Sequence, residues 1–368
     1  MQLPKKEKMK PTIWIFSLEP IQTRYTAQWH THVPQLLQTS LGEKFNVSQI
    51  DGEQKNTAVT PGAFLNFSDT NYWKSSQLCA FLDEFNAGNV SKDDHFIFTD
   101  AWNPTVIQLR YMSDLLGMNW RLHGLWHAGN YDPSDFLGRI VGDKPWVKHA
   151  EKSFYHAYDH NYFATKFHRT MFCENLLGFT PADTMHDNKI VLTGWPMEYM
   201  ESTLTPYSNL DKRDLILFPH RIAPEKQVEI FRDLAKELPQ FEWVVCQDTT
   251  LSKHEYHTLL GQSKIVFSAN LQETLGISSA AESVLTNAAP LVPDRLSYTE
   301  IFANHSEFMY PSCWTDSWDN YLLHRDELKA RIVAMMGDYT ALKPRIADYV
   351  GTAYRNFFHA DALISTIK

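Results

Sequence analysis

The stretch SANLQETLGISSAAESVLTNAAPLVPDRLSYTE, residues 268–300, decides the fold and carries most of the functional information. It continues an apolar segment, residues 264–268, that is typical of a buried strand. Gly276 then permits a tight entry into a run of small residues, 278–281, which we expect to be helical, and a second short strand is expected over 289–292. A strand, a glycine turn, a helix and a strand form one half of a nucleotide-binding crossover unit.

The residues around Gly276 indicate a ligand that combines phosphate with hydroxyl groups. The backbone amides of Leu275, Gly276 and Ile277 lie at the expected helix N-terminus, where free N–H groups and the positive end of the helix suit a phosphate. Glu273 before the helix and Glu282 within it are acceptors for vicinal hydroxyls. The simplest ligand with this pattern is a diphosphate between two polyols, such as a sugar and a ribose.

Two segments of the chain resemble the donor-binding region of retaining glycosyltransferases of the GT-B class, especially the family 4-like group. The downstream segment holds Glu273, Leu275, Gly276, Glu282 and Pro290, followed by LSYTE at 296–300. The upstream segment, PHRIAPEK at 219–226, resembles the part of the family where an arginine and a lysine clamp the donor diphosphate. The two segments lie about 50 residues apart and in the family's order.

This resemblance implies a role for each matching residue. Arg221 and Lys226 bind the donor diphosphate, Glu273 acts in catalysis by holding sugar hydroxyls, and Glu282 binds the nucleotide ribose. In one respect the sequence departs from the family, which places its two glutamates one residue closer together than the nine-residue separation found here. We therefore expect the helix entrance to absorb one extra residue.

Apolar runs alternate with helical patterns along the whole chain, which predicts an α/β protein with parallel sheets covered on both faces. At 368 residues the chain is too long for a single core of ordinary size. The resemblance implies two Rossmann-like domains facing across a cleft, with a C-terminal helix that crosses back. We expect an acceptor-side domain at 1–200, a nucleotide-sugar-binding domain at 201–340 and a closing helix at 341–368.

Candidate residues in the first domain follow from their places after strands. Asp100 ends an expected strand over 95–99, and functional residues gather at the carboxyl ends of parallel strands. His127 ends the next strand, where the resembling family commonly has a polar residue that faces the donor sugar. The first strand lacks the glycine-rich loop frequent in this class, so Thr23, Arg24 and Thr26 are expected to take its place. An N-cap explains Asp100 equally well, and His127 is equally consistent with simple packing.

The acceptor is suggested by the opening residues 18–29, LEPIQTRYTAQW, which resemble glycosyltransferases of tailed bacteriophages. Some of those relatives modify hydroxylated pyrimidines in phage DNA, so the resemblance implies a double-stranded DNA acceptor. A basic groove would then be needed, with Trp126 and Trp146 to stack against or wedge a flipped base. The available cations are Arg139, Lys144, Lys148, Lys152, Lys166 and Arg169.

Composition sets limits on the partners and the location. The net charge of −9 argues against indiscriminate binding to nucleic acid or to an anionic membrane. No apolar run approaches the roughly 18 residues that span a bilayer. Four scattered cysteines lack metal or disulfide spacing and indicate reduced, buried thiols, so we expect a cytoplasmic protein, or one of the host cytoplasm if a phage encodes it. No metal site and no cofactor are predicted, and a UDP-sugar is the expected donor; the oligomeric state is open.

Three alternatives stay open on sequence grounds. The acceptor is a polysaccharide, a glycolipid or a small molecule instead of DNA. The chain is a non-catalytic nucleotide-sugar-binding module, which the displaced glutamate spacing favours. Finally, the same fold supports a phosphorylase or an epimerase, neither of which needs an acceptor.

Overall fold

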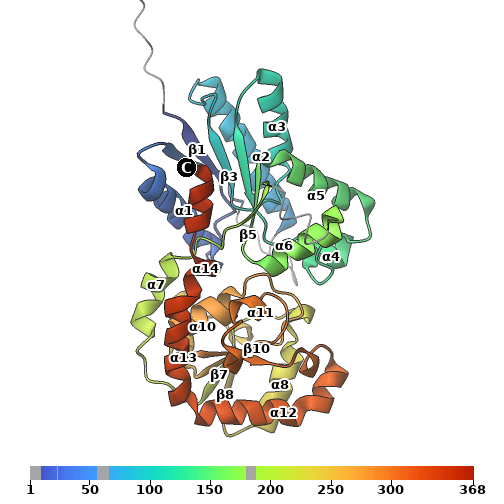
Figure 1. Cartoon of the computed structure of the whole chain (residues 1–368), viewed down its shortest axis with the longest axis vertical. Coiled ribbons are helices and arrows are strands. Elements are labelled where there is room, and N and C mark those ends of the chain that lie inside the picture. The colour runs from blue at the N-terminus through green and yellow to red at the C-terminus, as the bar shows by residue number, and fades with distance from the viewer. Residues whose placement is uncertain (1–9, 23, 56–65, 180–187) are drawn as a thin grey trace, which may run out of the picture. The chain divides into compact units, whose positions relative to one another are not determined.

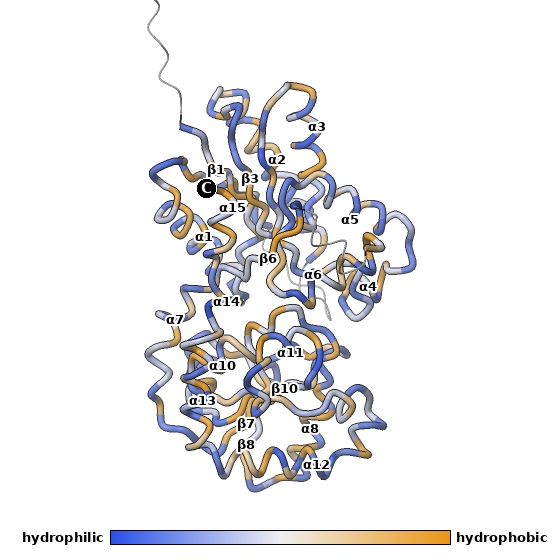
Figure 2. The backbone as a smooth tube through the Cα atoms, viewed as in Figure 1, coloured by the Kyte–Doolittle hydropathy of each residue, from blue (hydrophilic) through white to orange (hydrophobic). Residues whose placement is uncertain are grey.

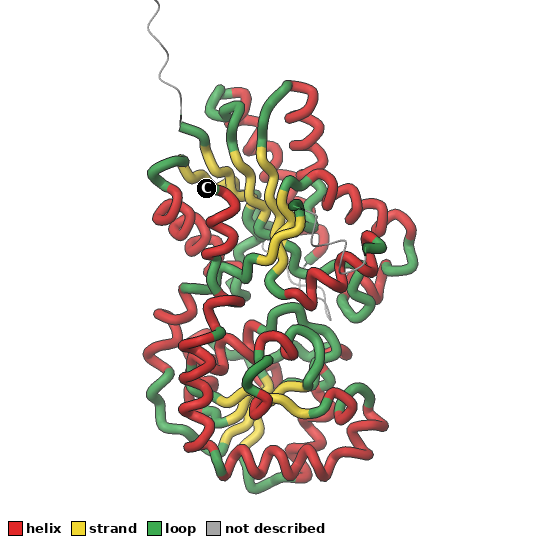
Figure 3. Tube along the Cα trace, viewed as in Figure 1, coloured by secondary structure: helices red, strands yellow, loops and turns green. Residues whose placement is uncertain are grey.

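The computed structural model describes residues 10–22, 24–55, 66–179 and 188–368, which divide into two compact units. The first unit contains the described residues up to Phe163, the described part of 171–192, and Asp361–Lys368. The second contains Ala164–Thr170 and Thr193–Ala360. Each unit is built around its own parallel sheet, with helices packed against the strands (Figures 1 and 3).

The sheet of the first unit has the strand order β2-β1-β3-β4-β5-β6, and every neighbouring pair in it is parallel. Its strands are β1 Thr12–Phe16, β2 Asn46–Ile50, β3 His95–Phe98, β4 Arg121–Leu125, β5 His160–Phe163 and β6 Ile190–Leu192. The helices of this part of the chain are α1 Thr26–Leu41, α2 Phe67–Asn86, α3 Thr105–Leu116, α4 Phe136–Val141, α5 Pro145–Ala157 and α6 Lys166–Phe172, with a π-helix at Cys173–Leu177.

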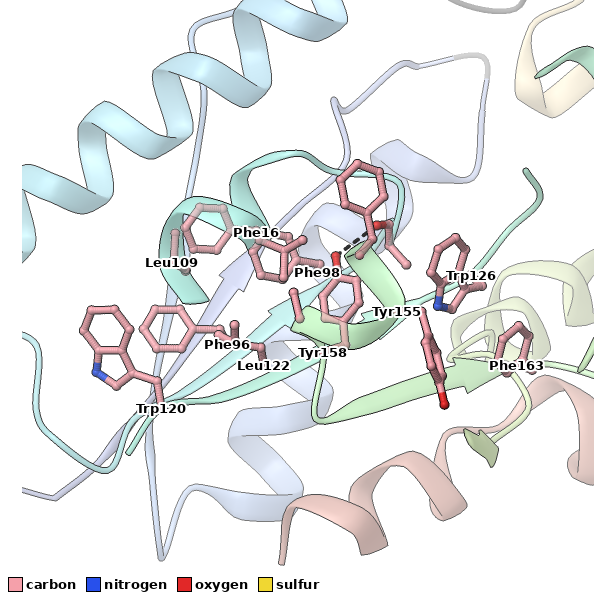
Figure 4. Close-up of a cluster of buried hydrophobic side chains, with 14 of the residues drawn as sticks. Phe16, Phe96, Phe98, Leu109, Trp120, Leu122, Trp126, Tyr155, Tyr158 and Phe163 are labelled. Atoms are coloured by element: carbon pink, nitrogen blue, oxygen red, sulfur yellow. Dashed lines mark hydrogen bonds between the residues drawn. The ribbon is translucent and has the colours of Figure 1, made fainter. Parts of the chain in front are cut away.

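The core of the first unit is rich in aromatic side chains. All five residues of β1, TIWIF, are buried, as expected for a strand covered on both faces. Apolar segments follow the strands in Figure 2, and Figure 4 shows the aromatic cluster that they form with the helices. Within it the Tyr158 hydroxyl donates to the Ala101 carbonyl oxygen at 3.0 Å, so this buried hydroxyl has its hydrogen bond.

The C-terminal helix returns to the first unit, as the sequence led us to expect. The residues expected to form one closing helix are divided among α13 Tyr339–Thr352, α14 Tyr354–Phe358 and α15 Asp361–Ile367. Only α15 belongs to the first unit. Its Thr366 hydroxyl lies 2.5 Å from the Tyr162 hydroxyl at the end of β5. This contact ties the end of the chain to the first sheet.

The second sheet has the order β11-β10-β9-β7-β8, again with parallel neighbours. Its strands are β7 Leu215–Phe218, β8 Glu242–Val245, β9 Ile265–Phe267, β10 Ala289–Pro293 and β11 Met309–Tyr310. Its helices include α7 Tyr199–Leu204, α8 Val228–Glu237, α9 Lys253–Gln262, α10 Ser283–Leu285, α11 Tyr298–Ile301 and α12 Trp318–Gly337. Helix α9 begins with a capping box, in which Ser252 and Glu255 bond each other's backbone amides.

Three histidines form a ladder across the first sheet. His95 on β3, His123 on β4 and His160 on β5 are joined by ring-to-ring contacts of 3.1 Å on both sides of His123. The hydroxyl of Tyr162 also lies 2.9 Å from the His123 ring and connects it to α15. Burial and the charge of Arg121 lower the pKa of His95 to about 4, and burial lowers the pKa values of His123 and His160 as well.

Acid is therefore expected to destabilise the first unit. The histidines are neutral in the folded chain but bind protons near pH 6.5 when unfolded, so their stabilising contribution is complete above pH 6.5. It is lost as the pH falls from 6.5 towards 4, at about 1.4 kcal/mol per unit of pKa shift. We expect His95→Gln to reduce the fall in Tm between pH 7 and pH 4.5, measured by circular dichroism. The exposed His149 gives the matched control, His149→Gln, and an equal fall in both variants would contradict the prediction.

The structure also bears on the predicted burial of the four cysteines and on the length of the helices. Cys173 and Cys246 are buried, but Cys79 and Cys313 are exposed, so the prediction of four buried thiols is wrong for these two. They lie on α2 and in the turn before α12, where the side chains face outward. Among the described helices none has the length and apolar character required to cross a bilayer.

Candidate functional site

The loop that follows β7 positions the two predicted diphosphate-binding cations. Arg221 lies just after the strand, and its guanidinium donates from Nε to Oε1 of Glu225 at 3.1 Å and from a second nitrogen to the same oxygen. The Glu225 side chain is only 2% exposed, whereas that of Arg221 is 33% exposed. Glu225 thus fixes the orientation of Arg221 without burying it.

Lys226 ends a single 3₁₀ turn, Pro224–Lys226, and its side chain is 8% exposed. The Lys226 ammonium donates to the Gln272 carbonyl oxygen at 2.6 Å and lies 3.5 Å from Oε2 of Glu273. Residues from two separate loops, one after β7 and one after β9, therefore meet at the carboxyl edge of the second sheet.

Glu273 is stabilised as a carboxylate. Burial alone would raise its pKa, but the Lys226 charge and the backbone amides of Gly276 and Leu275 outweigh burial and hold the pKa of Glu273 below its ordinary value. Its two oxygens differ in their contacts. Oε1 accepts from the Thr274 and Leu275 amides at 3.1 and 3.3 Å, whereas Oε2 lies 3.5 Å from the Lys226 ammonium and 3.4 Å from the Asn270 amide nitrogen.

These contacts correct the expectation of free amides at the helix entrance. The Leu275 and Gly276 amides already bond the Glu273 carboxylate, which occupies the anion position itself. Ile277 is the first residue of the following helix. Gly276 has φ +72°, in the left-handed region, and a Cβ atom there would lie 2.8 Å from the Tyr298 ring.

The extra residue between the two glutamates is absorbed as the sequence predicted. Residues Ile277–Glu282 form a π-helix that continues into α10, and the Ala281 amide reaches back five residues to the Gly276 carbonyl at 3.4 Å. Glu282 then accepts a 2.5 Å hydrogen bond from Tyr256 on α9. Burial raises the pKa of Glu282, an effect that bonds from Tyr256 and Ser278 partly oppose.

The LSYTE segment, residues 296–300, contacts the loop that carries Glu273. Tyr298 is fully buried, and its hydroxyl contacts Ser279 at 2.6 Å, Ser268 at 3.1 Å and the Asn270 amide at 3.2 Å. Glu300 accepts from the backbone amide at the start of α6, that of Lys166, at 2.7 Å. Tyr298 thus contacts the loop that carries Glu273, whereas Glu300 joins α11 to the start of α6.

His220 is a residue of this site that our sequence reasoning missed. Its side chain is buried, and its Nε2 atom has no hydrogen-bond partner among the described residues. Burial first, and then the charges of Lys226 and Arg221, lower the pKa of His220 to about 3, while Glu273 acts in the opposite direction. Lys226, Arg221 and Glu273 all therefore affect the pKa of His220. The available signal was a histidine two residues after the end of a buried strand, at the edge where parallel sheets place functional groups.

The first unit brings its two catalytic candidates together at the carboxyl ends of β3 and β4. Asp100 accepts from the Trp102 amide at 3.1 Å and lies 3.5 Å from the Lys74 ammonium. The alternative interpretation of Asp100 as the N-cap of the next helix is wrong, because Pro104 occupies the N-cap position of α3. Both ring nitrogens of His127 are engaged: Nε2 donates to the Thr99 carbonyl at 2.6 Å, and Nδ1 lies 2.7 Å from the Tyr25 hydroxyl. Burial lowers the pKa of His127, and Asp100 opposes this.

The three acceptor-side candidates, Arg24, Thr23 and Trp126, differ in where the structure places them. Arg24 lies near Tyr25, with its guanidinium carbon 5.9 Å from the ring centre, and its charge reaches His127. Thr23 lies outside the described residues. The expectation that Trp126 contacts a base is corrected, because the side chain is fully buried in the aromatic cluster and bonds Asn161 at 2.8 Å. Among the residues described, no cluster of three His, Cys, Asp or Glu is arranged to hold a metal ion.

Solved structures with a similar fold cover nearly the whole chain. The sucrose-phosphate synthase of Thermosynechococcus elongatus has a TM-score of 0.59 at 11% identity and matches over 97% of each chain. A glycosyltransferase from Rickettsia africae has a TM-score of 0.54 at 12% identity, also over 97% of each chain. Anabaena HepE, in complex with UDP and glucose, has a TM-score of 0.52 at 10% identity over 98% of each chain.

No protein-family model matches this sequence, and no curated protein does. At identities of 10 to 12% the structural likeness establishes the fold alone. With its two parallel α/β sheets and a last helix that returns to the first unit, the chain has the two-domain GT-B glycosyltransferase fold.

Proposed function

We propose that this protein is a retaining glycosyltransferase that moves a hexose or pentose from a nucleoside-diphosphate sugar, a UDP-sugar, to an acceptor hydroxyl. The observation that carries the proposal is the meeting of Lys226 and Glu273, with Arg221 nearby, at the carboxyl edge of the second sheet. A cation beside a carboxylate suits a ligand that joins an anionic group to a polyol. The UDP and glucose bound to Anabaena HepE, a protein of the same fold, support UDP as the nucleotide.

The chemistry assigned to these residues follows from where charge develops. As the bond between the anomeric carbon and the diphosphate oxygen breaks, positive charge builds on the sugar and negative charge on the diphosphate. Arg221 and Lys226 stabilise the diphosphate, an electrostatic effect of about 3 kcal/mol for a well-placed donor. Glu273 holds sugar hydroxyls, and Glu282 holds the ribose.

Retention is proposed without a covalent intermediate. The acceptor oxygen bonds to the anomeric carbon on the face that the diphosphate leaves, and the acceptor's proton passes to the departing phosphate oxygen. His127 and Asp100 are proposed to act at the sugar from the first unit. Because both ring nitrogens of His127 are engaged, a bond from His127 to the sugar requires the Tyr25 hydroxyl to give up its contact with Nδ1.

A hydroxylated pyrimidine in double-stranded DNA is our proposed acceptor. Lys148 and Lys152 lie four residues apart on α5, which places them on one face of the helix, and Lys144 is the residue that precedes its first turn. Trp146 on the same helix is 54% exposed and is available to contact a base, unlike Trp126. Arg139 precedes this helix in the first unit, whereas Lys166 and Arg169 belong to the second. The net charge of −9 requires any contact with DNA to be confined to such a local surface.

Mass spectrometry of acceptors tests this function. The protein is incubated with mixed UDP-sugars and three acceptors: hydroxymethylated double-stranded DNA, unmodified DNA and a simple sugar. We expect a sugar mass to be added to the hydroxymethylated DNA alone, and Glu273→Ala to abolish both transfer and slow donor hydrolysis. Addition to the simple sugar would contradict the DNA acceptor but not the transferase. Release of a sugar phosphate or conversion of the donor would instead indicate a phosphorylase or an epimerase, and binding without turnover would indicate a non-catalytic module.

A further inference from the structure

The turn at 224–227 is bound to the loop at 269–273 through both its backbone and its side chains. Three of its residues, at positions 225, 226 and 227, are buried. The hydrogen bonds run from the Leu271 amide to the Glu225 carbonyl oxygen at 2.8 Å, from the Lys226 ammonium to the Gln272 carbonyl oxygen at 2.6 Å, and from Nε2 of Gln227 to the Ala269 carbonyl oxygen at 2.6 Å. The turn therefore has a fixed place beside the loop that carries Glu273.

Arg221 precedes this turn and is held by one of its side chains. The Arg221 side chain is 33% exposed, so a ligand can reach it, whereas that of Glu225 is only 2% exposed. Two nitrogens of the guanidinium, Nε at 3.1 Å and a terminal nitrogen, donate to the same Oε1 atom of Glu225. Two bonds to one fixed oxygen restrict both the position and the plane of the guanidinium.

Glu225 has two opposite effects on an anion that binds at Arg221. Its negative charge repels the anion, but water screens this repulsion because Arg221 is partly exposed. Its bonds also order the long arginine side chain in advance, so less conformational freedom is lost when the anion binds. A guanidinium bonds phosphate through two parallel N–H groups, and its orientation therefore matters as well as its charge. Because solvent does not screen the ordering, we expect the ordering to dominate.

We propose that Glu225 is a positioning residue that orients Arg221 for the diphosphate of the nucleotide-sugar donor. The two cations of the site then depend on one turn, because Lys226 belongs to it and Arg221 is bound to it. This inference rests on the proposed function, since it requires a nucleoside diphosphate at Arg221 and Lys226. It adds a residue that acts on the diphosphate through another side chain, without contacting the ligand.

Calorimetry of UDP binding to the full chain tests the role of Glu225. In Glu225→Ala the carboxylate is removed, whereas Glu225→Gln keeps an oxygen acceptor in nearly the same shape without the charge. We expect Glu225→Ala to bind UDP about tenfold more weakly than the wild type, as for one side chain that must be ordered on binding. The glutamine variant should recover most of this loss. Glu229 is exposed on α8, and Glu229→Ala is the matched control, with the affinity of the wild type.

A double variant shows whether Glu225 acts through Arg221. If it does, Glu225→Ala weakens UDP binding in the wild type but has no further effect in an Arg221→Ala background. Thermal unfolding gives an independent readout. Arg221→Ala should lower the Tm because it removes the cation from a buried carboxylate, and adding Glu225→Ala should recover part of that loss.

Four outcomes would overturn the role of Glu225. UDP binding that is equal or tighter in Glu225→Ala would show that the carboxylate only weakens the charge of Arg221. A glutamine variant as weak as the alanine variant would contradict a role for the oxygen acceptor. An effect of Glu225→Ala that persists in the Arg221→Ala background would show that Glu225 acts through the fold of the turn. An Arg221→Ala variant with the affinity of the wild type would leave Glu225 nothing to position.

The failure of this inference is distinguishable from the failure of the proposed function. In all four outcomes the wild type still binds UDP, so a nucleotide site remains. A wild-type protein that binds neither UDP nor UDP-glucose would instead count against the proposed function itself.

Discussion

Lys226→Ala is expected to lower the rate of sugar transfer or donor hydrolysis about 100- to 1000-fold and to weaken UDP binding. The ammonium is nearly buried and lies 3.5 Å from the Glu273 carboxylate. Its removal takes away the charged donor that we propose to stabilise the leaving diphosphate, and the loss of one such donor has an effect of this size. It also leaves the Glu273 carboxylate without its cation, so the pKa of Glu273 should rise.

Lys236→Ala provides the matched control for this experiment. Lys236 lies exposed on α8 in the same unit, so the variant makes the same chemical change at a surface position. Steady-state kinetics and UDP calorimetry on both variants, with circular dichroism to check the fold, decide the question. If Lys226→Ala keeps the UDP affinity of the wild type, the diphosphate does not bind where we propose.

Gly276→Ala is expected to destabilise the second unit and to abolish donor binding. At φ +72° an alanine is strained by about 1–2 kcal/mol. Its Cβ would also lie 2.8 Å from the Tyr298 ring, which cannot move freely because its hydroxyl contacts Ser279 at 2.6 Å. Either the ring or the loop must shift, and the loop carries Glu273. We expect a clear fall in Tm and the loss of measurable UDP binding.

Gly88→Ala separates backbone strain from the steric overlap. Gly88 has a similar φ of +78°, but a Cβ there has no atom within 4 Å. Gly88→Ala should therefore lower the stability only by the energy of the backbone strain. Equal losses of stability in the two variants, measured by thermal unfolding, would show that the Tyr298 contact contributes nothing.

The local features of the candidate site were predictable because they depend on neighbouring residues. The strand at β9, the left-handed turn at Gly276 and the extra residue taken up by the π-helix all follow from a few residues in sequence. The partners of these residues were not predictable. Glu273 bonds the Leu275 amide, so the group expected to receive a phosphate already holds an anion from the chain itself.

The prediction for Trp126 in the first unit was wrong for the same reason, because the partners of a side chain are not visible in the sequence. Trp126 follows a strand that ends at the functional edge of the sheet, which made it a reasonable candidate to contact a base. Whether a side chain at that position faces solvent or core depends on what packs against it, and here Phe172 from α6 covers its ring, with the two centroids 4.7 Å apart. His220 was overlooked for the converse reason, because an unsatisfied nitrogen is defined only by the groups that surround it.

By itself the sequence determined the two parallel sheets, the order of their elements and the glycine turn after β9, because apolar runs, glycines and helical periodicity act over short distances. The tertiary structure alone decided that Lys226 meets Glu273, that Arg221 is held by a buried Glu225 and that Nε2 of His220 has no partner in the described part of the chain. These facts depend on side chains brought together from loops about 50 residues apart, and the burial and charge of each group are set by the packing of the whole unit.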